Sequence, residues 1–589
     1  MQPLSPFQRR RSDEDGFAMV FVILSMVVVT LFVVTGLAYA VGSTKSSRRD
    51  QDYNAALGAA QAGVDDYISH LNRNDNYGRL SPFNDCANKA LPGPKAPSPN
   101  TCGWNASTAA GWQRVATAAV VGNPEFHYDV DASQLDSTGS INVRSTGRAN
   151  GVVRSLEVAV SRGGSTQFLY YTDHEDGDPA NAFIYPGGMP ANCGAYWWGS
   201  SKDYPSQGAR QSNDGGCVEI TFIGGDVLEG AVHTNDTPLY SPVGGVYPSF
   251  KQGVETADPA CKASVQSNSA TWKYCDRYQT SASYNGVGPK QKDPLYLPDN
   301  SGAFSGYPGC QYVGPTRILL NSDGTMKVWS KQSTATAACG GISPMGVTVN
   351  VPNDQVVYVA SQSSGIHRCL SGEIDGTLPL GTYTGNTNQT QYTYDDSMLL
   401  SEQYCGQGNL YVQGTLKGHL TLAAQNSVVA TGDLKLAGGV NGSDLLGVVA
   451  GNSVEVFHPI MSTYTCSSYS SGRCTGTYVD QGDNTEPAGW PVRIGHSTDI
   501  ELDASIQTLA HSFLVQNYDK GTPQGKLTVR GSIAQEWRGI VGRGNPPSTG
   551  YLKDYHYDLR LKYSSPPYFP QFINAVWASR HSGEIPAQY

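Results

Sequence analysis

Four carboxylates lie close together in the first half of this 589-residue chain. Residues 173–178 read Asp-His-Glu-Asp-Gly-Asp, and the carboxylates are Asp173, Glu175, Asp176 and Asp178. Carboxylate oxygens at this density are the hard ligands that Ca²⁺ takes in proteins, although the run lacks the distant bidentate glutamate of an EF-hand loop. It therefore admits two interpretations, a Ca²⁺ site or a solvated acidic turn. No other cofactor is predicted.

A histidine and a carboxylate also lie together at residues 232–236, which read Val-His-Thr-Asn-Asp. A histidine oriented by a carboxylate can act as a general base. However, no nucleophile accompanies His233, and the Gly-His-Ser-Thr-Asp run at 495–499 departs from the Gly-x-Ser-x-Gly elbow. The sequence contains no P-loop, dinucleotide fingerprint or HExxH motif. We predict a structural turn at His233 and a chain that is not an enzyme.

Aromatic side chains cluster at residues 196–198 (Tyr-Trp-Trp) and 568–569 (Tyr-Phe). Such rings form flat stacking surfaces for sugars or partner proteins, and equally well fill the core beneath loops. The sequence leaves both interpretations open.

The chain contains 12 cysteines and no Cys-x-x-Cys motif, which argues against zinc knuckles and thioredoxin-like chemistry. Structural disulfides of an exported protein fit better, each typically worth about 2–4 kcal/mol. Connectivity stays open, but pairing between neighbours gives Cys86–Cys102, Cys193–Cys217, Cys261–Cys275, Cys310–Cys339, Cys369–Cys405 and Cys466–Cys474.

The composition is that of a turn-rich β protein of several domains, with 67 glycines, 34 tyrosines and only 15% charged residues. The net charge of −10 gives no indication of a globally basic nucleic-acid binder.

A long helix must carry these elements. Residues 17–42 are apolar and uncharged, longer than the roughly 20 residues that span a bilayer, and they follow a charged leader that ends at Gly16. Helical apolar spacing then continues to Leu71. An unbroken helix over residues 17–72 would be about 84 Å long.

This N-terminus resembles the class III signal and first helix of type IV pilins, because Gly16 is followed by Phe17 and a helix that turns amphipathic and alanine-rich. Residues 55–67 resemble the PilX and general-secretion K-type minor pilins. The resemblance implies that a prepilin peptidase cuts between Gly16 and Phe17 and methylates the new amine. A simple membrane anchor is the alternative.

One position departs from most pilins, which carry glutamate as the fifth mature residue to neutralise a neighbour's terminal amine. Phe21 occupies that position here. In the K-type family this absence accompanies a place at the filament tip, so the resemblance implies a tip or initiator subunit. The alternative is that the glutamate is dispensable.

Strand patterns follow the helix at residues 126–130, 141–146 and 152–160, with an Asn150-Gly151 turn between the last two. From about residue 167, short apolar runs alternate with small turn residues, and 410–422 place leucines and Val412 on one side. This predicts a β-solenoid or a sandwich, without a strict repeat. Residues 232–236, 538–542 and 557–560 resemble large PilX-type pilus-assembly proteins of Gram-positive (actinobacterial-type) bacteria.

We therefore predict an α+β, mostly β chain with a leader (1–16), a transmembrane helix half (17–42), an amphipathic half (43–75), a small pilin-like antiparallel sheet (76–165) and a large β-solenoid-like head (166–589). The expected function is a minor pilin that resides in the membrane before assembly and at the cell surface afterwards. Its expected partners are other pilins, a prepilin peptidase, and a surface polysaccharide, host protein or DNA. The alternative is a membrane-anchored solenoid enzyme acting on surface polysaccharide.

Overall fold

The computed structural model describes residues 15–74, 77–78, 112–115, 122–181, 184–194, 196–199, 210–211, 217–266, 269–273, 275, 282–285, 287–334, 339–340, 343, 345–368, 390–393, 404–458, 460–470, 473–483, 499–519, 521–544 and 547–587. The chain forms two compact units. The first comprises Met1–Ala132, Asn142–Ala159 and His581–Tyr589, and the second comprises Ser133–Ile141 and Val160–Arg580.

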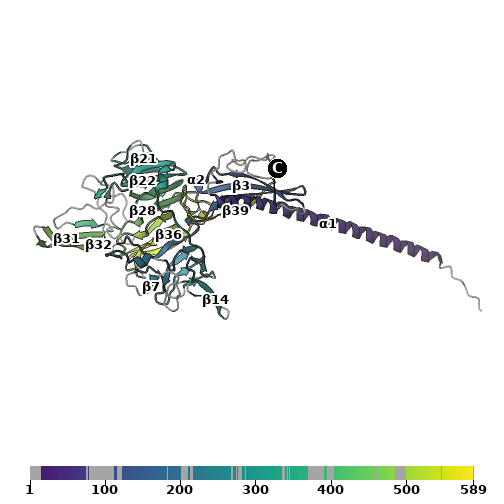
Figure 1. Ribbon diagram of the computed structural model, residues 1–589, viewed down its shortest axis with the longest axis horizontal. Coiled ribbons are helices and arrows are strands. Elements are labelled where there is room, and N and C mark those ends of the chain that lie inside the picture. Colours follow the sequence, from purple (N-terminus) through teal and green to yellow (C-terminus); the bar gives the residue numbers. More distant parts are fainter. Residues whose placement is uncertain are drawn as a thin grey trace, which may run out of the picture. The chain divides into compact units, whose positions relative to one another are not determined.

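The first unit is organised on one continuous helix, α1 (Asp15–Arg73), drawn in purple in Figure 1. Residues 17–51 are exposed along their whole length, and the most apolar 18-residue window has a mean hydropathy of 3.0 with none of it buried inside the chain. By length and composition this helix can cross a membrane. The predicted long N-terminal helix is confirmed.

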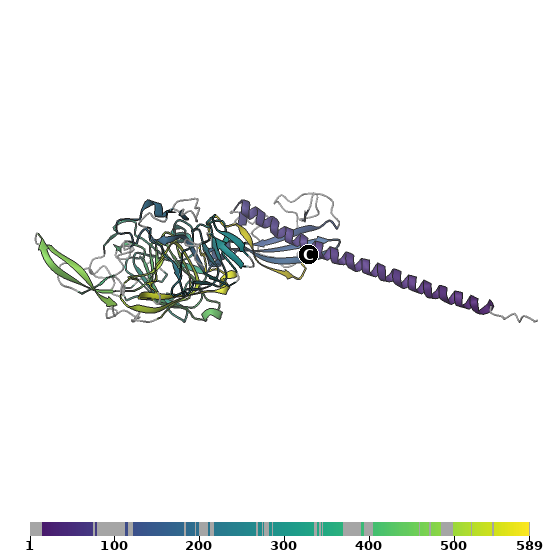
Figure 2. The same ribbon diagram turned by 90° about the horizontal axis from the view of Figure 1, so that it is seen from below.

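An antiparallel sheet accompanies the second half of α1, and Figure 2 shows its strands lying along that part of the helix. In spatial order its strands are β1 (Gln113–Arg114), β2 (Glu125–Asp131), β3 (Ser140–Ala149), β4 (Val152–Arg162) and β39 (Trp577–Ile585). The three predicted strands are present as β2, β3 and β4. Asn150 and Gly151 form the predicted turn, with φ of 47° and 82°. The chain end returns as the fifth strand, β39, which pairs with β4.

Small residues let the helix approach the sheet closely. The helical residues fully buried against it are Ala56, Ala59, Ala60, Val64, Tyr67 and Leu71. At Gly147 on β3, a Cβ atom would lie 2.0 Å from the Ala56 carbonyl oxygen and 2.3 Å from the Ala60 nitrogen. The helix and the sheet therefore touch backbone to backbone at Gly147.

The second unit is a stack of parallel strands on two faces, joined by the long strand β36 (Pro523–Arg538). On the first face the spatial order is β17 (Lys290–Gln291), β13 (Val254–Thr256), β10 (Val232–Thr234), β5 (Tyr170–Gly177), β36, β34 (Ser505–Thr508), β29 (Leu445–Ala450), β27 (His419–Ala424), β22 (Gln355–Ala360) and β18 (Gly309–Val313). Such a stack is the predicted solenoid-like, curled β domain.

The second face runs alongside in the same order. Its strands are β16 (Ser283–Tyr284), β12 (Ser249–Phe250), β9 (Val227–Glu229), β38 (Thr549–Tyr557), β36, β33 (Ile500–Leu502), β28 (Val428–Leu436), β26 (Leu410–Leu416) and β19 (Thr316–Leu320), all parallel. The antiparallel strands β20 (Thr325–Ser330) and β21 (Val347–Asn350) follow β19. In addition, β30 (Val454–Val456) pairs with β28, β35 (Phe513–Val515) pairs with β30, and β37 (Gly542–Arg543) pairs with β38. β22, β28 and β36 are labelled on the stack in Figure 1.

Smaller elements decorate the stack. The short strands are β6 (Trp198–Gly199), β7 (Arg210–Gln211), β8 (Phe222–Ile223), β11 (Tyr240–Ser241), β14 (Lys262–Gln266), β15 (Ser269–Lys273), β23 (His367–Arg368), β24 (Thr390–Thr393) and β25 (Tyr404–Cys405), and the long hairpin is β31 (Ile460–Ser470) with β32 (Arg473–Asp483). The short helices are α2 (Leu135–Thr138), η2 (Ser165–Gln167), η3 (Ala191–Gly194), η4 (Gly302–Gly306), η6 (Gly439–Asn441) and η7 (Leu559–Lys562).

The chain enters this stack in its middle. From β5 it winds outward through β10 and β13 to β17, then reappears at the opposite end as β18 and winds back until β36 pairs with β5. Residues 292–308, the crossing segment, connect the two ends. Nine strand spacings of about 4.8 Å amount to about 43 Å, which 17 residues can reach at about 3.3 Å each.

Apolar side chains on inward positions fill the interior of the stack. The leucines at 410, 416, 420 and 422 and Val412 all belong to one buried cluster, as their shared side predicts. Gly414 and Gly418 both have positive φ, 114° and 112°, and Gly418 makes the turn between β26 and β27. Positive φ at both glycines lets the backbone bend at these positions.

We expect Gly147→Ala to destabilise the first unit by about 1–3 kcal/mol, because the new methyl group forces α1 away from β3. The matched control is Gly58→Ala on the exposed side of the same helix, where a Cβ meets nothing within 4 Å. That substitution should stabilise the helix by up to about 1 kcal/mol. Hydrogen exchange of helix amides measures both effects, and equal protection in the two variants would contradict the close packing.

Candidate functional site

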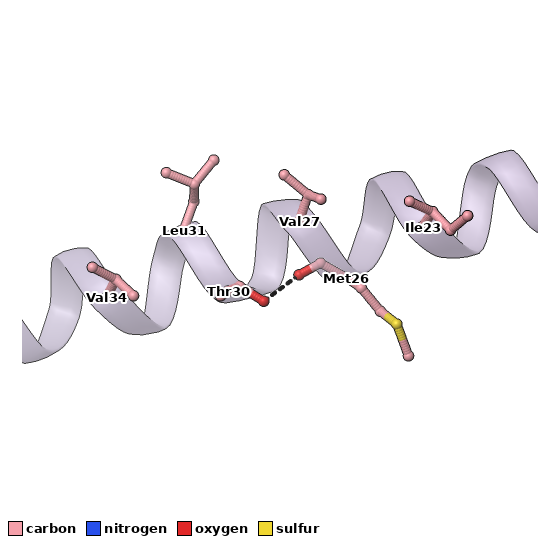
Figure 3. A pocket seen from close by; sticks show the side chains of 6 residues that line it. All are labelled: Ile23, Met26, Val27, Thr30, Leu31 and Val34. Atoms are coloured by element: carbon pink, nitrogen blue, oxygen red, sulfur yellow. Dashed lines mark hydrogen bonds between the residues drawn. The ribbon is translucent and has the colours of Figure 1, made fainter.

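The exposed half of α1 is the first candidate site. Figure 3 shows Ile23, Met26, Val27, Leu31 and Val34 projecting from the helix without a covering partner in the described chain. The Thr30 hydroxyl donates to the Met26 carbonyl at 2.6 Å, so the one polar side chain in this group is satisfied within the helix. The surface is therefore suited to lipid or to other apolar helices.

The N-terminal turn of this helix contains the predicted cleavage position. Gly16 and Phe17 both lie within α1, and the Phe17 and Phe21 rings lie 5.7 Å apart. The Phe21 side chain is exposed and apolar, so it offers no carboxylate to a neighbouring amine. Cleavage and methylation at Gly16 and Phe17 stay predictions.

The acidic run at 173–178 lies on β5 and continues one residue beyond it, with all of its residues buried. A register shift between Trp537 and Arg538 interrupts the regular pairing of β5 with β36, and the four predicted Ca²⁺ ligands diverge. Glu175 points toward Arg538, Asp173 toward Glu536 and Asp178 toward His511. Within the described chain, each group of residues with metal-ligand geometry contains only one of the four carboxylates. The solvated-turn interpretation does not describe these buried residues either.

Glu175 forms a fully buried ion pair with Arg538 of β36. The Arg538 Nη1 atom donates to a Glu175 carboxylate oxygen at 2.5 Å, and the two side chains are 1% and 0% exposed. The guanidinium also lies 3.5 Å from the ring centre of Phe222. An ion pair this deep is costly to break, because the remaining charge would stay buried without a partner.

A second ion pair lies in the same interior. The Lys553 ammonium group contacts Asp226 at 3.1 Å, and burial lowers the pKa of Lys553. Its ammonium nitrogen lies 5.9 Å from the Phe222 ring, on which Arg538 also packs. The interior of the stack thus holds two cations and two anions in balance around one aromatic ring.

Asp173 faces Glu536 on the opposite side of the sheet. Burial and then the adjacent charge of Asp173 raise the pKa of Glu536 to about 9, and burial also raises the pKa of Asp173. The Tyr196 hydroxyl donates to Asp173 at 2.7 Å and the Asn235 amide donates to its other oxygen. At neutral pH one proton is therefore retained between the two carboxyl groups.

His174 lies beside this pair in an aromatic stack. Its ring is parallel to Tyr196 at 4.5 Å and to Trp537 at 4.0 Å, with interplanar angles of 6° and 11°. One ligand atom each from Asp173, His174 and Glu536 lies within 4.8 Å of the others, which is metal-ligand geometry. His174 was not among the predicted ligands, although it stands in the acidic run.

Asp178 anchors the end of β5 to a loop that follows β34. Its two carboxylate oxygens accept hydrogen bonds from Ser512 at 2.6 Å and contact the His511 imidazole at 2.8 Å. One of them also accepts the Ala180 amide at 2.9 Å. Burial alone would lower the pKa of His511, but the hydrogen bond and charge of Asp178 raise it.

The 232–236 run is strand β10 followed by a bend at Asn235 and Asp236, so His233 lies on a strand and not in the turn that we predict from the sequence. His233 contacts Glu255 through Nδ1 at 3.2 Å and Asn235 through Nε2 at 3.1 Å, and its ring stacks on Tyr171. Asp236 accepts main-chain N–H groups of Glu175, Trp197 and Thr237 at 2.7–2.9 Å. The functional groups of this motif are thus engaged in holding the local backbone.

A repeat that connects these strands is visible once the register is known. Residues 232–236 (Val-His-Thr-Asn-Asp) and 254–258 (Val-Glu-Thr-Ala-Asp) pair along β10 and β13. Thr234 aligns with Thr256 on one side and with Thr172 of β5 on the other. Comparing the sequence with itself at this offset would have indicated the parallel stacking.

The two aromatic clusters differ in setting. Tyr196 and Trp197 are half-buried, and Trp197 has φ of 60°, a strained value for a bulky residue. The Trp197 indole nitrogen donates to the Asn235 carbonyl at 3.0 Å, which helps to hold this backbone. Phe569 instead fills a core cluster, and Tyr568 packs against Tyr307 at 4.6 Å.

Three of the expected cysteine pairs are disulfides in the described chain: Cys193–Cys217, Cys261–Cys275 and Cys310–Cys339. Cys405 is also disulfide-bonded, while its expected partner Cys369 lies outside the described residues, as do Cys86 and Cys102. The backbone of Cys466 and Cys474 lies in the β31–β32 hairpin, and their side chains are outside the description.

Comparisons with known proteins find similarity only among solved structures. No protein-family model and no curated protein matches the chain. Among solved structures, the crystal structure of the competence-associated pilin ComZ from Thermus thermophilus aligns over 91% of this chain and 98% of that chain, with 12% sequence identity and a TM-score of 0.24. At this TM-score the match carries no inference about fold or function.

We expect Arg538→Met to destabilise the second unit by about 3–5 kcal/mol, because Glu175 would remain buried as an unpaired charge. The double variant Glu175→Gln/Arg538→Met should recover part of this loss. Urea denaturation followed by tryptophan fluorescence compares the variants. Equal losses in the single and double variants would contradict a buried charge pair.

We also expect the His511–Asp178 contact to make stability depend on pH. The pKa of His511 is higher in the folded chain than its usual value of about 6.5. Its contribution is therefore fully present below about pH 6.5 and is lost as pH rises through the folded-state pKa. The urea midpoint is measured at about pH 6 and at about pH 9 for each variant. The difference between the two midpoints should be smaller in His511→Gln than in the control His419→Gln. His419 is a suitable control because its imidazole contacts the exposed Asp354.

Proposed function

We propose that this chain is a minor pilin of a type IV pilus or a related secretion filament. The observation that carries the proposal is the division of α1 into two halves. The first half exposes an apolar surface along residues 17–42, and the second half packs its small residues onto an antiparallel sheet. A membrane anchor alone does not require that the anchor continue as the core helix of a folded unit.

The apolar half of α1 has two environments that satisfy it. Before assembly it lies in the membrane as a single span, and after assembly it packs among the helices of neighbouring pilins. Both environments replace contact with water along the same apolar side chains. The partners are thus other pilins and minor pilins, with a prepilin peptidase acting first at Gly16.

A tip or initiator position is supported by Phe21 and by the size of the second unit. Phe21 cannot neutralise the terminal amine of a subunit beyond it. The second unit contains about 430 residues, and a compact domain of that size has a radius of gyration of about 22 Å. Packed helices lie only about 8–10 Å apart, so one such unit at the filament end avoids the crowding that a repeated one would create.

At the cell surface the second unit serves assembly priming or adhesion. Half-buried aromatic side chains at Tyr196 and Trp197 suit stacking on a sugar or a protein surface. A surface polysaccharide, a host protein and DNA are the candidate ligands.

The alternative of a solenoid enzyme acting on polysaccharide is less well supported. Glycoside hydrolysis uses two carboxyl groups about 5–10 Å apart, which leaves room for the sugar or for a water molecule. Asp173 and Glu536 share a hydrogen bond instead, and their nearest neighbours pack against them.

Co-expression with a prepilin peptidase tests the proposal. Mass spectrometry should find mature chains that begin at N-methylated Phe17, because the peptidase cuts after Gly16. Gly16→Ala should retain the leader and be absent from purified filaments. Gly36→Ala is the matched control, since this glycine lies in the same exposed apolar helix with nothing within 4 Å of a new Cβ. An uncut wild-type leader would refute the pilin assignment.

A further inference from the structure

Asp173 and Glu536 occupy adjacent positions on two parallel strands. The register pairs Thr172 with Gln535 and His174 with Trp537, so the two carboxyl groups lie side by side between these pairs. Like charges directly opposite each other destabilise a sheet. The arrangement therefore requires a positive charge or a bound proton between them.

The other buried acids of this region have cationic partners from the chain itself. Arg538 pairs with Glu175 and Lys553 pairs with Asp226. Among the described residues, no lysine or arginine forms an ion pair with Asp173 or Glu536, and the charged groups that act on Glu536 are the further acids Asp173, Asp299 and Asp178. This is a locally negative site at the point where β5 and β36 meet.

His174 supplies an imidazole nitrogen at the same place. Its imidazole is clamped between Tyr196 and Trp537, and its Nε2 atom lies 3.8 Å from an Asp173 oxygen. Donor atoms around a tetrahedral ion are about 3.4 Å apart when the ligand bonds are about 2.1 Å. The three donor atoms lie within 4.8 Å of one another, and the Glu536 side chain is half-buried.

We propose that Asp173, His174 and Glu536 bind a divalent transition-metal ion of the zinc type. Two carboxylates and one imidazole are a ligand set that suits such ions, whereas Ca²⁺ takes oxygen ligands in greater number. Tyr196 and Asn235 each donate a hydrogen bond to Asp173, which fixes the orientation of that ligand. The ion joins the first strand of the stack to the strand that closes on it.

The proposed site differs in its ligands from the Ca²⁺ site predicted from the acidic run. It uses one carboxylate of that run, Asp173, and takes its other two ligands from His174 and from a residue 363 positions further along the chain. Of the other three carboxylates, Glu175 pairs with Arg538 and Asp178 accepts a hydrogen bond from Ser512. Asp176 belongs to a second group with metal-ligand geometry, which shares His174 and adds Asp236.

The test uses the full chain in detergent micelles after treatment with a chelator. Titration with Zn²⁺ should show one site per chain by calorimetry and raise the thermal midpoint of the second unit. Ca²⁺ and Mg²⁺ at the same concentrations should do neither. Replacement by Co²⁺ should give a visible absorption band, which reports directly on the ligand set.

Two substitutions remove ligands while preserving the packing. Glu536→Gln retains a group that can donate a hydrogen bond to Asp173, and His174→Phe retains the stacked ring. Each should weaken Zn²⁺ binding at least tenfold, with the circular dichroism spectrum unchanged. The control Asp354→Asn removes an exposed carboxylate 2.7 Å from His419 and should bind Zn²⁺ as the wild type does.

Three results would overturn the proposal. These are no stoichiometric Zn²⁺ binding by the wild type, unchanged affinity in both ligand variants, and an equal response to Ca²⁺. In the first case the pair Asp173–Glu536 is held by its proton alone. None of these outcomes bears on whether the leader is cut at Gly16, so the pilin proposal is tested separately.

Discussion

Strand β5 begins the β-rich unit in the chain but lies in the middle of it in space. The strands that follow extend the stack in one direction, and the crossing segment of residues 292–308 carries the chain to the other end. The stack is complete only when β36 pairs with β5, more than 350 residues later. Main-chain hydrogen bonds alone do not distinguish one parallel register from the next, so side chains must specify the closing register.

Polar side chains perform that specification. Glu175 meets Arg538 inside the stack, and Asp173 meets Glu536 on the opposite side of the same strand pair. A slip of one residue would exchange the two sides and would bury each charge without its partner, at a cost of several kcal/mol. Apolar residues at these positions would pack in either register. Charge at the closing strand therefore adds little net stability but excludes the wrong alignment.

Local patterns predicted the first unit well, because an apolar run, a two-residue alternation and an Asn-Gly turn each depend on neighbours in the chain. The order of the solenoid strands could not be predicted this way. Glu536 is an unremarkable residue in the sequence, and only the β5–β36 register places it beside Asp173. The acidic run was recognisable as a site for chemistry, but its carboxylates diverge at a register shift between β5 and β36 that only the distant pairing reveals. β39 escaped prediction because its partner, β4, lies over 400 residues away.

The two units place opposite demands on their surroundings. The second unit pairs Glu175 with Arg538 and Asp226 with Lys553 inside the stack, whereas the first half of α1 exposes Phe17, Phe21 and Phe32 with no partner from the described chain. Burying each such side chain is worth about 1.5–3 kcal/mol, and 18 large apolar side chains are exposed from Phe17 to Val41. Exposure of this surface to water is therefore strongly unfavourable. Lipid and the apolar faces of other helices are the two surroundings that remove this surface from water.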